Sequence, residues 1–331
     1  MKSLQIGPYP ETTLLDLPVP VPGDGQIVMR VEAVATCPQW DLHLRNNEPM
    51  FIGHQFSYPY TPGQPGHEAT GYVAAVGAGV QSVRVGDRIS AWRDSGHRVH
   101  GCYAQFVLMP ADNVILVPPQ LPFSATASVE LAMCVGACFL MLKEMNALRG
   151  KRVAVNGLGP AGLVAAQMAK AEGAAEVIGF DTNADRCGYA RERCGLTSAH
   201  TPDTTSSDLY PARPHRPSID TGVDCVGAKR SVEWLMDRIL DSVALFGVQR
   251  EDYTFAPRHY HPALRLCGYP GHSRAAAEYA VALMESGDLD LGLLITHQMP
   301  LEQYNTAIDL LETQRAIKVC FTPWASPING T

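Results

Sequence analysis

Residues 151–181 read KRVAVNGLGPAGLVAAQMAKAEGAAEVIGFD, and this stretch decides the fold of the second half of the chain. The apolar run that ends at Asn156 predicts a short strand, and the alanine-rich run after the glycines predicts a helix. Residues 176–180 predict a second strand, which Asp181 closes. A strand, a glycine turn, a helix and a strand in this order are typical of one βαβ unit of a parallel sheet.

The glycine-rich turn has the spacing G-x-G-x-x-G between strand and helix. Gly157 permits the tight turn, Gly159 lets a pyrophosphate approach the backbone, and Gly162 allows close helix packing. The start of the following helix offers free N–H groups to phosphates. Asp181 can accept hydrogen bonds from both adenosine ribose hydroxyls and would repel a 2′-phosphate, which favours NAD over NADP. The expected cofactor-binding residues here are Gly157, Gly159, Pro160, Ala161, Gly162 and Asp181. The alternative is a tight turn in a sheet protein without a nucleotide.

Strand and helix signals continue to alternate through residues 223–226 and 242–246, which predicts a doubly wound parallel sheet. Residues 1 to about 125 are instead rich in Gly and Pro and contain short β-branched runs, such as residues 27–31 and 106–108. They predict a compact, mostly β domain. The full length of 331 residues also favours two domains, because single cores stop growing at about 250–300 residues.

Composition excludes several classes of function. The net charge is -7 with 18% charged residues, and basic residues form no long run, so no nucleic-acid partner is expected. The first ten residues do not have the apolar core of a signal peptide, and we expect no membrane span because no apolar stretch approaches about 20 residues. Nine cysteines without a C-x-x-C pair argue against a disulfide framework and favour a reducing cytoplasm.

The first half contains Gly66-His67-Glu68, then Gly71 and Gly77, and then Gly86-Asp87-Arg88. From residue 66 to residue 89 the chain resembles the zinc-containing medium-chain alcohol dehydrogenases, whose pattern reads GHExxGxVxxVGxxVxxxxxGDxV. With the glycine turn downstream, the resemblance covers essentially the whole chain. It implies a Rossmann doubly wound parallel sheet inserted into a GroES-like, mostly β catalytic domain. The implied domains are residues 1–130 with 273–331, and residues 131–272. It also implies a homodimer.

The resemblance further implies a catalytic zinc, which takes three protein ligands and keeps one open position. Cys37 and His67 match two of the family's ligands. Asp41 matches the carboxylate that orients the ligand histidine. Glu68 matches an acid beneath the metal, and Lys318 matches a cation close to it, which we group with the cofactor-binding residues.

The third ligand is open between Glu130 and Cys134. Polyol-type members of the family use a Glu at this point, and other members use a Cys. The two residues are four apart, so on a helix they share one face. We favour Glu130, because a carboxylate in an apolar helix needs a partner or a metal, whereas a buried Cys behaves as a small hydrophobe.

Two departures from the family pattern bear on the chemistry. The cysteine-rich lobe that holds a second, structural zinc is missing, since only Cys102 follows the Gly-Asp pair at that point; one zinc per chain is expected. The stretch CPQWDLH, residues 37–43, has one inserted residue and lacks the hydroxyl that normally relays the substrate proton. We expect His43 at the outer end of a relay, reached through the cofactor ribose, a water or Gln39 in place of the missing hydroxyl.

Three side chains between the ligand segments are candidates for the substrate pocket or for packing: His54, Tyr58 and Tyr60. The resemblance as a whole implies an NAD-dependent zinc oxidoreductase acting on a small secondary alcohol of the polyol, sugar or cyclitol type. The alternatives are a zinc-free NAD(P)H quinone or enone reductase of the same superfamily and a non-catalytic NAD-binding protein. Metal content separates the first two.

Overall fold

The structure is a computed structural model that describes residues 1–202, 209–213, 215, 218–260 and 263–324. The chain divides into two compact units, Met1–Leu131 with Leu291–Thr331, and Ala132–Asp290. The first boundary lies next to Glu130. Residues 273–290, which the sequence placed with the first domain, pack with the second unit. The reason is that Gly136 of one helix lies directly against Ala276 and Tyr279 of the next, with an added Cβ 3.3 Å from the Ala276 carbonyl.

The first unit is mostly β. A seven-stranded sheet has the order β14-β15-β3-β4-β5-β7, with β6 also paired to β3, and β1 pairs with β2 in a separate ribbon. The strands are β1 (Lys2–Ile6), β2 (Thr12–Asp16), β3 (Gln26–Ala35), β4 (Glu68–Val76), β5 (Arg88–Ala91), β6 (Phe106–Pro110), β7 (Val114–Leu116), β14 (Ile295–Met299) and β15 (Lys318–Phe321). Buried side chains of β3, including Ile27, Met29 and Val31, form the centre of the core.

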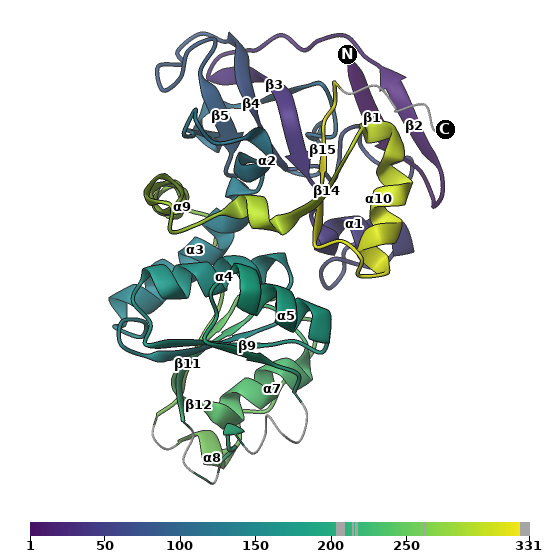
Figure 1. Cartoon of the computed structure of the whole chain (residues 1–331). Helices are drawn as coiled ribbons and strands as arrows, with labels where there is room; N and C mark the ends of the chain where they lie inside the picture. Colours follow the sequence, from purple (N-terminus) through teal and green to yellow (C-terminus); the bar gives the residue numbers. More distant parts are fainter. Residues whose placement is uncertain (203–208, 214, 216–217, 261–262, 325–331) are drawn as a thin grey trace. The chain divides into compact units, whose positions relative to one another are not determined.

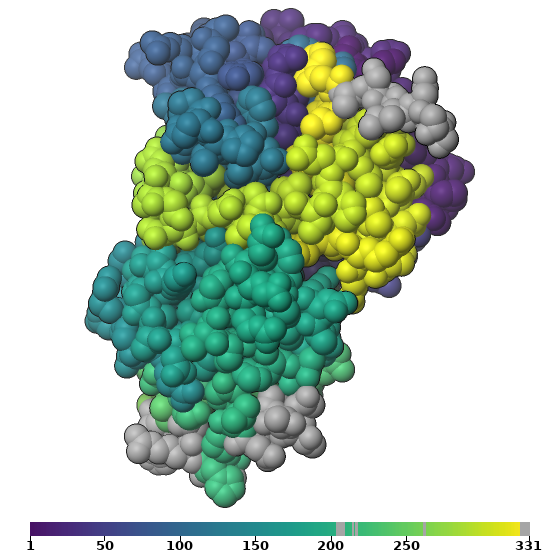
Figure 2. Space-filling model, viewed as in Figure 1, coloured from purple at the N-terminus to yellow at the C-terminus, as the bar shows by residue number. Residues whose placement is uncertain are grey.

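Short helices complete this unit. They are α1 (Pro38–Asn46), η1 (Ala111–Asn113), α2 (Phe123–Thr126), η2 (Leu291–Leu294), η3 (Leu301–Gln303) and α10 (Tyr304–Glu312). Pro38 opens α1, where its missing N–H costs nothing, and Asn47 ends the helix in the left-handed conformation. The beginning and end of the chain meet here, since β15 pairs with β3. Figure 2 shows the yellow C-terminal segment against purple N-terminal residues.

The second unit is a parallel α/β layer structure. Its six strands have the order β10-β9-β8-β11-β12-β13, and every pairing is parallel. The strands are β8 (Arg152–Asn156), β9 (Glu176–Phe180), β10 (Ser198–His200), β11 (Ile219–Asp224), β12 (Ile239–Leu245) and β13 (Arg265–Cys267). The helices are α3 (Val129–Glu144), α4 (Pro160–Ala171), α5 (Ala184–Arg193), α7 (Lys229–Arg238), α8 (Pro257–Tyr260) and α9 (Arg274–Ser286). In Figure 1, α4 and α5 cover one face of the sheet and α7 the other. The predicted doubly wound fold is confirmed.

The helical stretch Phe123–Glu144 corrects one expectation from composition. By length and apolar character it is sufficient to cross a membrane, with a mean hydropathy of 1.8. Within the structure, however, 83% of its most apolar window is buried. A core helix of a globular protein has the same properties, because it is apolar on every side.

Candidate functional site

Cys37, His67 and Glu68 come together although they lie on separate segments. Cys37 precedes the first turn of α1, and His67 and Glu68 stand at the start of β4. One donor atom of each lies within 4.8 Å of the others. The Nδ1 of His67 lies 2.7 Å from the carbonyl oxygen of Pro65. Because a carbonyl only accepts, Nδ1 carries a proton, which leaves Nε2 as the nitrogen that a metal would bind.

Glu130 approaches the same imidazole. Its Oε2 lies 3.7 Å from the Nε2 of His67. Burial by itself lowers the pKa of His67, but the hydrogen bond with Cys37 and the charges of Glu130, Cys37 and Glu68 raise it well above the ordinary value. A thiol and two carboxylates around one imidazole therefore favour a positive charge at their centre. Thiolate, imidazole and carboxylate are the donors that zinc prefers, so the residues present fit a zinc ion.

Glu68 and Lys318 form a buried ion pair through Oε1 and Nζ, and neither side chain is exposed. The Oε2 of Glu68 is buried and has no hydrogen-bond partner among the described residues. Such an orphan acceptor is costly unless a cation or a water completes it. Lys318 thus accompanies the candidate metal centre. Its grouping with the cofactor-binding residues stays a prediction, and its charge is fully enclosed beside Glu68.

The resemblance implied that Asp41 orients His67, but in the structure the carboxylate of Asp41 has other partners. Its carboxylate accepts hydrogen bonds from the hydroxyls of Tyr103 and Tyr304 and from the backbone N–H of Cys37 at 2.8 Å. Burial raises the pKa of Asp41 to about 6, although these donors oppose the shift. The local reason is helix geometry: Asp41 is one turn into α1, so its side chain reaches back to the N–H groups at the helix start. Asp41 therefore fixes the Cys37 segment.

Gln39 and His43 lie one turn apart on α1 and contact each other. The Nε2 of Gln39 lies 3.0 Å from the Nε2 of His43, whose Nδ1 lies 3.3 Å from the carbonyl oxygen of Glu48. Since the amide donates and the carbonyl accepts, these contacts make Nε2 the acceptor from Gln39 and Nδ1 the donor to Glu48. The structure brings the two residues of the expected relay together.

The other expected side chains differ in their surroundings. The Tyr58 hydroxyl donates to the carbonyl of Leu44 at 2.5 Å, and Tyr60 is buried in the core, so both pack. Cys134 belongs to the second unit, where its sulfur lies within 4.8 Å of a ring nitrogen of His272. Cys102 is buried, which raises its thiol pKa to about 12, and the described residues place it in no group of three potential ligands.

The glycine turn of the second unit has the predicted geometry. Gly157 has φ +86°, a conformation that side chains rarely adopt, and a Cβ on Gly162 would lie 1.8 Å from the Gly157 carbonyl oxygen. The turn follows β8, and α4 starts directly after Gly159. The strand order reverses between β8 and β11, which is where open α/β sheets bind their ligands.

Asp181 lies at this turn, as expected, but its carboxylate already has backbone partners. Its two oxygens accept the N–H groups of Leu158 at 2.7 Å and Asn183 at 2.8 Å. Each oxygen keeps a lone pair for a ribose hydroxyl. Sequence reasoning missed Arg186, whose Nη1 lies 4.0 Å from the carboxylate and 3.8 Å from the position of a Gly159 Cβ. The sequence position of Arg186 could have indicated this contact, because it lies in the first turn of α5, shortly after the end of β9.

The first unit also contains a cavity of about 280 Å³ that is separate from the candidate metal centre. It is lined by β6 together with Met1, Pro20, Gln26, Ser95, Val99 and His100. None of the candidate ligands contributes to it. The cavity is therefore not part of the candidate metal centre.

Comparisons with known proteins agree with this arrangement. Residues 23–119 match the alcohol dehydrogenase GroES-like domain. The L-threonine 3-dehydrogenase of Stenotrophomonas maltophilia is 26% identical over 339 residues, which span 92% of this chain and 94% of the relative. The crystal structure of galactitol-1-phosphate dehydrogenase from Escherichia coli superposes with a TM-score of 0.82 at 21% identity, covering 98% and 100% of the two chains.

A second similar structure carries a cofactor. A short chain alcohol dehydrogenase from Escherichia coli CFT073, complexed with NADH, superposes with a TM-score of 0.82 at 21% identity, covering 97% of this chain and 99% of the other. Fold and site together define an oxidoreductase of the alcohol dehydrogenase type, which acts on a small molecule. Within that class, the domain match, the sequence relative and the similar structures support the zinc-dependent medium-chain alcohol dehydrogenase family.

Proposed function

We propose that this chain is an NAD-linked zinc dehydrogenase of secondary alcohols of the polyol, sugar or cyclitol type, with Cys37, His67 and Glu130 as metal ligands. The observation that carries the proposal is the grouping of the His67 imidazole with the Cys37 thiol and the Glu130 carboxylate, whose Oε2 lies 3.7 Å from the Nε2 of His67. When bound, zinc and the nicotinamide supply Lewis acidity toward an alcohol oxygen and an acceptor for hydride.

The chain's own residues would bind and orient the reactants. Asp41 holds the Cys37 N–H and so keeps the thiol next to His67. The N–H groups at the start of α4 bind the pyrophosphate, and Asp181 binds the ribose. We expect His43 to stand at the outer end of the route by which the substrate proton leaves, reached through the cofactor ribose, a water or Gln39, whose amide contacts the Nε2 of His43.

Metal analysis joined to an activity screen tests the proposal. We expect about one zinc per chain and NAD-dependent oxidation of at least one polyol, because the described residues of the first unit offer one set with a thiol, an imidazole and carboxylates. Zinc near zero together with quinone or enone reduction would support the reductase alternative. NAD binding without turnover of any substrate would support the non-catalytic alternative. A homodimer remains part of the proposal, and light scattering tests it.

A further inference from the structure

The loop that replaces the missing cysteine-rich lobe is tied to the segment carrying His67. The side-chain amide of Gln64 donates to the carbonyls of Gly96 at 3.1 Å and Val99 at 3.0 Å. The backbones of Gly63 and Gly101 cross so closely that a Cβ on Gly63 would lie 2.2 Å from the Gly101 oxygen. The position of the loop is therefore set by the residues that directly precede His67.

This loop presents His97 to α1. The His97 ring lies on the Trp40 ring with centroids 4.2 Å apart and an angle of 40°. Trp40 follows Cys37 by one helical turn, and it is only 9% exposed. Three further rings stand edge-on to Trp40 at 5.7–6.3 Å: Phe51, His54 and Phe56. The Trp40 cluster, as we call these five rings, is thus fixed next to the candidate metal centre.

Packing fixes the His97 ring, but its polar atoms are unused. Among the residues that the structure describes, no side chain or backbone group forms a hydrogen bond with either ring nitrogen. Burial lowers the pKa of His97, and the nearby His67 and His54 lower it further, while Asp94 opposes them. A neutral imidazole offers one donor and one acceptor. By contrast, the Nδ1 of His54 is already engaged with the Met50 N–H at 3.4 Å.

We propose that His97 is a specificity-determining residue that hydrogen-bonds a second polar group of the substrate, so that the enzyme selects vicinal diols and related polyfunctional alcohols over monofunctional ones. This inference rests on the proposed function. A site built to hydrogen-bond a substrate hydroxyl discriminates strongly against the analogue that lacks it, because its polar group is then left unpaired in a desolvated place. Apolar walls such as Trp40 and Phe56 by themselves discriminate weakly between such analogues.

The test compares 2,3-butanediol with 2-butanol, which differ by one hydroxyl, as substrates of the zinc-containing enzyme with NAD. We expect wild type to prefer the diol by at least about tenfold in kcat/KM. His97→Phe keeps the ring on Trp40 and should lower kcat/KM for the diol about tenfold or more, mainly through KM, with 2-butanol changed less than about twofold. His97→Gln should retain most of the preference, since an amide also donates and accepts.

His100→Phe is the matched control, because His100 is exposed on the same loop and lines the separate cavity. It should behave as wild type. Equal losses for both substrates in His97→Phe, or no loss for either, would overturn the inference while leaving the proposed function intact. A wild type that prefers neither substrate would also overturn it. A wild type that contains no zinc and oxidises no alcohol would instead overturn the proposed function.

Discussion

At the scale of single residues, the chemistry is concentrated on one imidazole. The Pro65 carbonyl selects the tautomer of His67, and Cys37, Glu68 and Glu130 place negative charge around it. The sequence left the third ligand open. In the structure the donor atoms of Glu68, Cys37 and His67 all lie within 4.8 Å of one another, and Glu68 is paired with Lys318. We therefore keep Glu130, whose Oε2 lies 3.7 Å from the Nε2 of His67, as the proposed third ligand.

Substitution of the candidate third ligand gives the first prediction. Glu130→Ala should lose most of its zinc and its activity, because only Cys37 and His67 would remain as strong ligands. Cys134→Ala should keep both, since the proposed ligand set does not include Cys134, and truncation of this buried side chain should cost about 1–3 kcal/mol of stability at most. Zinc content by atomic absorption measures the outcome. Exchanged phenotypes, with Cys134→Ala losing zinc and Glu130→Ala keeping it, would assign the role to Cys134.

We expect cofactor selectivity to depend on Asp181 and Arg186. We expect NAD to be preferred over NADP by about tenfold in kcat/KM, or about 1.4 kcal/mol, which is modest because Arg186 partly offsets the repulsion between Asp181 and a 2′-phosphate. Asp181→Ser should reverse or abolish the preference. In the double variant with Arg186→Gln, NADP use should fall again. Equal use of both cofactors by wild type would show that Asp181 does not face the ribose.

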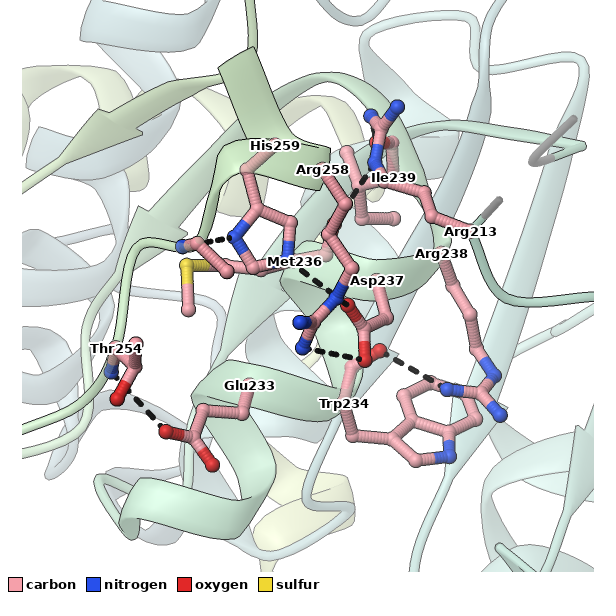
Figure 3. Close-up of polar contacts among 11 residues, drawn as sticks. Arg213, Glu233, Trp234, Met236, Asp237, Arg238, Ile239, Thr254, Arg258 and His259 are labelled. Carbon is pink, nitrogen blue, oxygen red and sulfur yellow. Dashed lines mark hydrogen bonds and ion pairs between the residues drawn. The ribbon is translucent and has the colours of Figure 1, made fainter. Parts of the chain in front are cut away.

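At the scale of elements, the end of α7 is fastened by a polar cluster far from the glycine turn along the sequence. Figure 3 shows Arg258 and His259 of α8 converging on Asp237. His259 is fully buried, and its Nδ1 accepts the Ala256 N–H, so Nε2 is the donor to Asp237 at 2.8 Å. Arg213 donates to the Ile239 carbonyl at 2.6 Å, which satisfies a helix-terminal acceptor.

Removal of this carboxylate gives a stability prediction. Asp237→Asn should lower the free energy of unfolding at pH 7 by about 1–3 kcal/mol, because charged hydrogen bonds become neutral and one donor is left unmatched. Burial raises the pKa of Asp237, but Arg258 and His259 outweigh it and lower the pKa overall. The stabilisation is therefore present above the unfolded value of about 3.9 and is lost as the pH falls through the lower folded value.

Urea unfolding of wild type and variant between pH 7 and pH 3 measures this difference, which should shrink only below about pH 4. Asp241→Asn is the matched control, since Asp241 pairs with Arg265 on the surface with both side chains at least 35% exposed. It should cost less than about 1 kcal/mol. Similar costs for the two variants would show that the buried His259 adds nothing.

At the scale of the whole molecule, metal and nucleotide are predicted to bind to separate units. Cys37→Ala or His67→Ala should remove zinc and abolish alcohol oxidation, while the glycine turn stays intact in residues 132–290. NADH at a hundredfold excess over its Kd should then still stabilise the zinc-free variant by about 2.7 kcal/mol. Thermal unfolding with and without NADH measures this. Loss of the NADH effect in both variants would mean that nucleotide binding depends on the metal centre.

The sequence by itself determined the features that depend on neighbouring residues. Strand, glycine turn and helix across residues 151–181 follow from local periodicity and from backbone freedom at Gly157, and β8, α4 and β9 lie where that reading placed them. Such signals are local because hydrogen bonds within a helix or turn join residues a few positions apart. That Cys37 and His67 meet was implied by the family resemblance of the GHE segment and not by a local pattern.

Only the tertiary structure decided the partners of the buried polar groups. Asp41 bonds to Tyr103, 62 positions away, and to Tyr304, 263 positions away; Glu68 meets Lys318 across 250 positions. His97 reaches Trp40 because Gln64 holds its loop. A buried donor or acceptor must be satisfied by whichever group the packed core brings within about 3 Å. The packing of strands and helices that are distant in sequence determines which group that is, and the periodicity of the sequence does not indicate it.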